Sequence, residues 1–181
     1  FKFFYNRIKP ADKFYWGNSA GWYFPNISLR HNNNKEYKSL IQKLIVGSDK
    51  WILDDGSIKD RISRGDRALW YHHTGLGEAF MIMEIAKAAD VLIPKNFEQK
   101  LLKAVELFHD SFLDNSKIEP WALKQHNSQA SNGIQRFTNN LNNISFNGSW
   151  FHIMQYRYPE HKTSNFLKSN MSYRAISFKG D

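Results

Sequence analysis

The chain has 181 residues, of which 41% are hydrophobic and 15% aromatic, a composition that indicates a folded protein and excludes a disordered one. Cysteine is absent, which excludes disulfides and thiol catalysis. The formal net charge of +8 is concentrated at the two ends, with +6 in residues 1–50, −3 in 51–120 and +5 in 121–181. Basic ends favour a polyanionic partner, either nucleic acid or an acidic polysaccharide, unless they only reflect a lysine-rich and asparagine-rich composition.

The first half of the chain predicts helices separated by turns. Residues 1–15 are aromatic and basic without a clear period, and residues 16–29 indicate a helix or a broken helix, because Pro25 disfavours a helix interior. Apolar residues recur at helical spacing over 35–51, which predicts an amphipathic helix, and 54–57 predicts a turn. Residues 67–90 predict a long helix that is apolar on most sides and therefore buried, where Gly75 and Gly77 allow close approach of neighbours.

The second half continues the helical pattern. Asn96 and Gln99 resemble a capping pair that opens a helix with one apolar stripe. Residues 114–148 predict a long asparagine-rich loop region with at most a short helix. A short helix is expected over 150–158, and residues 173–178 can form a strand or a tail. No apolar run is long enough to cross a membrane, and no signal peptide is visible. We therefore predict an all-α protein of helical hairpins, with residues 1–181 in a single helical domain.

The run RGDRALWYHH at 64–73 gathers two guanidinium groups, a phenol and two imidazoles where a polar turn meets an apolar helix. Arg64 and Tyr71 are seven residues apart, about two helical turns, so on a continuous helix they share one face. A permanent cation beside a phenol can hold an anion while a proton moves. The alternative is an ordinary helix start, with solvated arginines and partly buried aromatic and histidine side chains.

The segment Arg64–Val91, with this run and the apolar spacing after it, resembles the central motif region of the mannuronate-type alginate lyases. Residues 150–156 are similar to a short Trp-to-Tyr helix near the C-terminal end of that family, and the whole resemblance spans residues 14–158. It implies an incomplete (α/α) toroid, in which helical hairpins surround a deep cleft for an anionic sugar chain. Because family members are longer, this chain would be a C-terminal portion of the toroid or a shortened version.

The resemblance also implies a chemistry, which is β-elimination at a uronic acid without a cofactor, in a periplasmic or secreted protein. A base removes the proton on C5, which is acidic only when the adjacent carboxylate is neutralised, and an acid protonates the leaving oxygen on C4. The family pattern assigns neutralisation to Arg64, with Arg67 in support, and proton transfer to Tyr71. His72 also matches a family position and is expected to orient or share the proton.

One part of the family pattern is altered. The family carries an Asn-Asn-His run before a Tyr-Trp pair, and this chain has ADKFYW at 11–16 in one register or GNSAGW at 17–22 in another. Lys13 can bind the carboxylate in the first register, and Asn18 can neutralise it in the second. Neither register keeps the histidine, so Tyr71 must act as both base and acid, or a histidine at 72 or 73 must replace it, or activity has been lost.

Aromatic and histidine side chains complete the candidate site. Trp16, Trp22 and Trp70 can stack on sugar rings, although aromatic residues at this density also fit a core, and His73 can contact substrate or be a buried histidine. No histidine or carboxylate spacing predicts a metal site. The expected partner is thus an anionic polysaccharide. The alternatives are a binding module of the same fold without turnover, and a basic nucleic-acid-binding helical protein, which has only charge and aromatic content in its favour.

Overall fold

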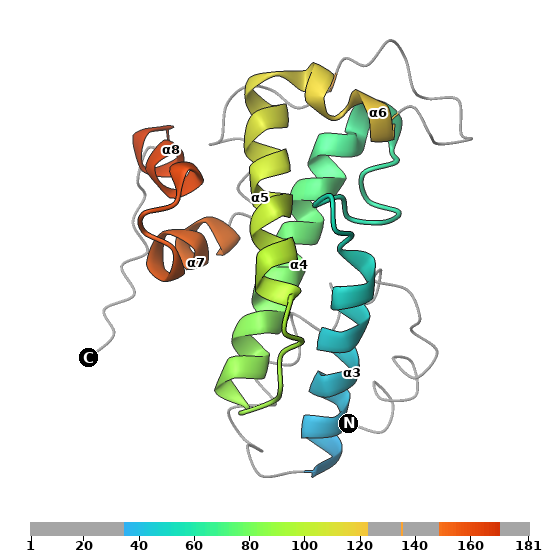
Figure 1. Ribbon diagram of the computed structural model, residues 1–181, viewed down its shortest axis with the longest axis vertical. Coiled ribbons are helices and arrows are strands. Elements are labelled where there is room, and N and C mark those ends of the chain that lie inside the picture. The colour runs from blue at the N-terminus through green and yellow to red at the C-terminus, as the bar shows by residue number, and fades with distance from the viewer. Residues whose placement is uncertain (1–34, 123–134, 136–148, 171–181) are drawn as a thin grey trace.

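The computed structural model describes residues 35–122, 135 and 149–170. This part of the chain is mostly helical and contains no strand, only an isolated bridge between Ile52 and Ile58, so the all-α prediction is confirmed there. Three long helices, α3 (Lys35–Trp51), α4 (Ala68–Ala88) and α5 (Phe97–Leu113), run alternately up, down and up along the molecule (Figure 1). They match the helices expected over 35–51 and 67–90 and after Asn96.

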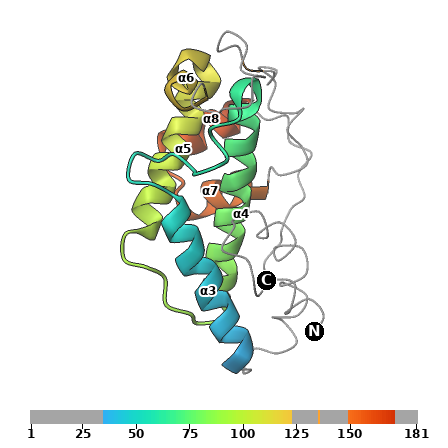
Figure 2. The ribbon, with the colours of Figure 1, turned by 90° about the vertical axis from the view of Figure 1, so that its right-hand side faces the viewer.

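Helix α4 is the central element of the core. It contacts α3, α5 and α7, and Figure 2 shows these elements gathered around it from the side. Most of its side chains are buried, as its nearly uniform apolar character predicts. Gly75 allows a close approach, since a Cβ there would lie 3.0 Å from Cδ1 of Ile58 and 3.3 Å from Cγ of Arg61. The segment before α4, which contains Ile58 and Arg61, is therefore the part of the chain that packs closely against Gly75.

Helix α5 packs on α4 through one apolar stripe, as predicted. Its buried residues include Phe97, Leu101, Val105, Phe108 and Phe112. The prediction that Asn96 and Gln99 form a capping pair at the start of α5 is wrong. Asn96 occupies the N-cap position, but its side chain makes no capping hydrogen bond. Its φ of −97° and ψ of 0° differ from the extended backbone that usually aims an N-cap side chain at the helix amides.

The predicted turn at 54–57 joins α3 to the segment before α4 and lies on α5. Asp55 accepts hydrogen bonds from the backbone amide and the hydroxyl of Ser57, which closes the turn. Gly56 has a φ of +83°, and a Cβ at this position would lie 2.6 Å from the Lys103 carbonyl oxygen of α5. Glycine is therefore required by both the backbone conformation and the close approach.

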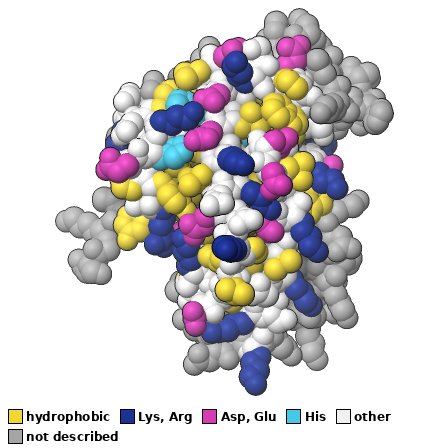
Figure 3. Space-filling view, in the orientation of Figure 1, with side chains coloured by type: hydrophobic (Ala, Val, Ile, Leu, Met, Phe, Trp, Pro, Cys, Tyr) yellow, Lys and Arg dark blue, Asp and Glu magenta, His cyan; other side chains and the backbone are white. Residues whose placement is uncertain are grey.

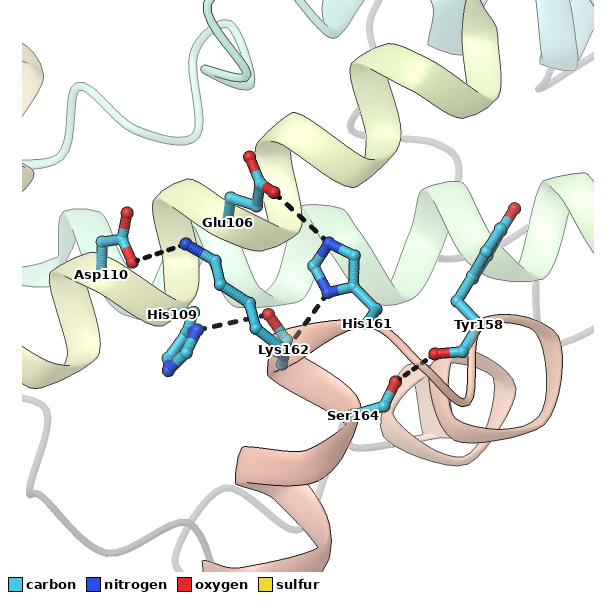
Figure 4. Close-up of polar contacts among 8 residues, drawn as sticks. Glu106, His109, Asp110, Tyr158, His161, Lys162 and Ser164 are labelled. Carbon is cyan, nitrogen blue, oxygen red and sulfur yellow. Dashed lines mark hydrogen bonds and ion pairs between the residues drawn. The ribbon is translucent and has the colours of Figure 1, made fainter.

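Two short C-terminal helices, α7 (Ser149–Arg157) and α8 (Lys162–Asn170), pack beside α4 and α5. The helix expected over 150–158 corresponds to α7, whereas α8 was not predicted. Figure 4 shows how α8 is attached to α5: Lys162 pairs with Asp110, His161 with Glu106, and Thr163 contacts His109. These pairs join residues that are far apart in sequence, so no local pattern predicts them.

The region expected as a loop over 114–148 begins with a 3-10 turn, η3 (Asn115–Lys117), and the short helix α6 (Glu119–Ala122). Residues 123–134 and 136–148 lie outside the described residues, as do the elements expected before residue 35 and over 173–178. Within the described helices, none combines the length and the apolar character needed to cross a bilayer.

Candidate active site

The run at 64–73 folds as a short 3-10 turn that leads into α4. Arg64 is the N-cap residue of η2 (Gly65–Arg67), and α4 begins at Ala68. Gly65 has a φ of +57°, a left-handed conformation that glycine adopts without steric cost. This sharp start turns the arginine back over the first turn of α4. The helix is therefore not continuous from 64 to 71, but the two side chains still meet.

Arg64 and Tyr71 are in direct contact. The guanidinium carbon of Arg64 lies 5.1 Å from the centre of the Tyr71 ring, within the range of a cation–π interaction. Both side chains are partly exposed. The Nε of Arg64 donates to the backbone carbonyl of Asp60 at 2.9 Å, and among the described residues this is the hydrogen bond that its side chain makes. The Nη groups of Arg64 thus remain available to an anion beside the phenol ring.

Two further side chains from the run are exposed. Trp70 is 41% exposed although it is a large apolar side chain, and Arg67 is exposed. Arg64 and Arg67 lie just before α4, and Trp70 and Tyr71 lie in its first turn. We call Arg64, Arg67, Trp70 and Tyr71 the α4-start group. It offers two cations, a phenol and an indole to solvent.

His72, the next residue along α4, is buried. It is 0% exposed, and its Nε2 is 2.9 Å from the backbone carbonyl of Ala104 on α5. The carbonyl can only accept, so Nε2 carries the proton, and Nδ1 has no partner among the described residues. Burial lowers the pKa of His72 from 6.5 to about 4, against a smaller opposing effect of the Ala104 carbonyl. The neutral side chain links α4 to α5 through this hydrogen bond. Because it is buried, a polymer at the surface cannot contact it.

His73 is also buried, at 1% exposure, and its Nδ1 accepts a hydrogen bond of 3.0 Å from the indole of Trp150 on α7. Its ring packs against Phe108 and Phe151, with centroid distances of 5.6 and 5.4 Å. This is the buried arrangement that the sequence left open as the alternative to substrate contact. The structure gives His73 a packing role between α4, α5 and α7.

The remaining expected site residues, Lys13, Trp16, Asn18 and Trp22, lie outside the described residues. Among the described residues no group of three or more histidine and carboxylate side chains is arranged to hold a metal ion.

Sequence reasoning missed two sets of residues that support the α4-start group. Gln135 is buried and bridges the start of α4, because its Oε1 accepts from the Leu69 amide at 2.9 Å and its Nε2 donates to the Gly65 carbonyl at 3.0 Å. Arg61 and Glu78 form a buried ion pair. The Gln135 contact has no sequence signal, but Glu78 carried one, as a carboxylate among the otherwise uncharged residues at 74–83 of the helix.

No protein-family model, curated protein or solved structure matches the chain.

Proposed function

We propose that this protein is a polysaccharide lyase that cleaves an alginate-like, uronate-containing polysaccharide by β-elimination. The observation that carries the proposal is the contact between the Arg64 guanidinium and the Tyr71 ring at an exposed helix start. Support also comes from the resemblance of Arg64–Val91 to the mannuronate-type alginate lyases. The helical fold of the described residues is compatible with the toroid of that family, of which α3, α4 and α5 would form one part. The resemblance would also make this a periplasmic or secreted protein.

Arg64 has the chemistry that the first step requires. A carboxylate bound by its Nη groups would be neutralised by a permanent charge, and guanidinium groups bind carboxylates in bidentate fashion. Neutralisation lets negative charge develop on the substrate when C5 loses its proton. Arg67, exposed three residues along the chain, would add positive potential for a polyanion.

Tyr71 would transfer the proton. Its phenolate oxygen would accept the proton from C5, the electrons of the C5–H bond would form the C4–C5 double bond, and the C4–O bond would break. The same phenol would then return the proton to the leaving oxygen, so one group would serve as base and acid in turn. We assign neither His72 nor His73 to this step, because both side chains are buried. Trp70 would stack on a sugar ring.

The alternatives make different predictions. A binding module of the same fold would retain the α4-start group and bind uronate polymers without product. A nucleic-acid-binding protein requires a continuous basic surface. Figure 3 shows acidic and basic side chains interspersed on the face that it draws, so this face carries no continuous basic surface of that kind.

The direct test is an ultraviolet absorbance assay for the unsaturated sugar end, with alginate, glucuronan and related polymers as substrates. Tyr71→Phe should lower the rate by roughly 10²-fold or more, since it removes the proton-transfer group. Tyr156→Phe is a matched control, because Tyr156 also lies beside an arginine (Arg157, 5.3 Å) but is 78% exposed on α7. An unchanged rate in Tyr71→Phe would refute the assignment of the tyrosine, and binding without absorbance would favour the module.

A further inference from the structure

Glu78 and Arg61 form an ion pair in the interior beside the α4-start group. One Arg61 Nη nitrogen donates to both carboxylate oxygens of Glu78 at 2.7 and 2.8 Å. The two side chains are only 5% and 3% exposed. Buried pairs of this kind contribute little net stability, because desolvation of both charges offsets their attraction. In some folds such pairs specify one arrangement of the chain over another.

The pair fixes the segment before α4 onto the face of α4 that carries Tyr71. Gly75 and Glu78 follow Tyr71 by four and seven residues, which places all three along one side of the helix. Ile58 and the Arg61 side chain pack directly against Gly75, within 3.0 to 3.3 Å of where a Cβ would lie. The segment thus lies along this face, and the Glu78 carboxylate anchors it at Arg61.

The anchored peptide is the one that holds Arg64. The carbonyl that accepts from Arg64 Nε belongs to Asp60, so it is in the same peptide unit as the Arg61 amide, which itself donates to the Ile58 carbonyl at 3.1 Å. Asp60 has a φ of +59°, a conformation that a non-glycine residue adopts at a cost and that the surrounding contacts must maintain. This peptide is held by its backbone hydrogen bond to Ile58, and the ion pair of the Arg61 side chain fixes the same residue to α4.

We infer that Glu78 is a positioning residue, which acts through Arg61 and the Asp60 carbonyl to hold the Arg64 guanidinium over the Tyr71 ring. Without the carboxylate, Arg61 loses the ion pair that holds its side chain on α4, and the 58–61 segment is no longer fixed to this face by that pair. The Asp60 carbonyl then shifts, and Arg64 loses the hydrogen bond that its Nε donates to this carbonyl. The effect on turnover rests on the proposed lyase function, but the effect on the Arg64–Tyr71 contact does not.

The contact can be measured without substrate. In the full chain with its eight tyrosines replaced by 3-fluorotyrosine, the ¹⁹F resonance of position 71 is the one missing from Tyr71→Phe. Arg64→Ala gives the resonance of the ring without its cation. Glu78→Gln should move the wild-type signal toward that position. Glu84→Gln is the matched control, because Glu84 lies on the same helix and makes a bidentate pair with Arg157, at 3.0 and 2.7 Å, but faces α7.

A second variant covers the case in which Glu78→Gln does not fold. Arg61→Leu/Glu78→Leu removes both members of the buried pair together, so the helices should form, yet the 71 signal should still move toward that of Arg64→Ala. A wild-type signal in either folded variant would overturn the inference, as would an equal shift in Glu84→Gln.

The activity readout separates this inference from the proposed function. If the wild-type chain cleaves a uronate polymer, Glu78→Gln should lower kcat by roughly 10²-fold, as expected when a catalytic group is misplaced by about 1 Å, with a smaller change in KM. An unchanged kcat together with a moved signal would overturn the positioning role in catalysis. If no polymer is cleaved by the wild-type chain, the lyase proposal fails, while the ¹⁹F comparison still decides whether Glu78 holds the Arg64–Tyr71 contact.

Discussion

The buried histidine at 72 gives the most quantitative prediction, because its surroundings disfavour one protonation state. The neutral ring satisfies the Ala104 carbonyl through Nε2 at 2.9 Å. A second proton on Nδ1 would meet no acceptor among the described residues and would place a charge in the core. The pKa in the folded chain is therefore about 4, compared with 6.5 when the residue is solvated.

The sign of the pH effect follows from linkage. Because the folded state has the lower pKa, the unfolded chain binds the proton first, so acid favours unfolding. The contribution to stability is fully present above about pH 6.5 and is lost as the pH falls toward 4. Each pH unit in this window corresponds to about 1.4 kcal/mol, so acidification to about pH 5 should cost about 2 kcal/mol from His72 alone.

The experiment compares the wild type with His72→Gln, whose amide can replace Nε2 as donor but does not titrate in this range. Urea unfolding followed by far-ultraviolet circular dichroism gives the free energy of unfolding of each at about pH 7 and pH 5. His109, whose pKa burial also lowers, contributes equally to both chains and cancels in the comparison. The wild type should lose about 2 kcal/mol more than the variant. Equal losses would show that His72 titrates as a solvated group and would refute its place in the core.

Three further predictions concern the turn, the start of α4 and the exposed indole. Gly56→Ala should lower the free energy of unfolding by about 2 kcal/mol or more in urea titration, because φ is +83° and the Cβ would meet the Lys103 carbonyl; an unchanged midpoint would contradict this packing. Gln135→Ala should cost about 2 kcal/mol in the same assay, since it leaves the buried Leu69 amide without its acceptor, and a neutral effect would show that the bridge is not formed. Trp70→Ala should raise KM for a uronate polymer roughly fivefold, for a stacking contact of about 1 kcal/mol; an unchanged KM would remove Trp70 from the binding surface.

The candidate site shows how far local reasoning extends. The seven-residue spacing predicted that Arg64 and Tyr71 would share one face of a continuous helix. The two side chains are in contact, but by a different route. A 3-10 turn at Gly65–Arg67 brings the arginine back over the helix, where a continuous helix had been expected. The spacing alone also could not tell which of the neighbouring side chains at 70–73 face solvent. Trp70 is exposed, and the two histidines are buried.

The sequence by itself determined the helices at 35–51, 67–90 and 150–158, because apolar periodicity is a local property of the chain that packing then preserves. It also determined the turn at Gly56. Only the tertiary structure decided which polar side chains became partners. The buried Arg61–Glu78 pair, the buried Gln135 bridge and the exposed Lys162–Asp110 pair join residues 17 to 70 positions apart, and the last of these contacts holds α8 on α5. The electrostatic environment of a side chain depends on what the fold brings beside it, and no spacing along one helix contains that information.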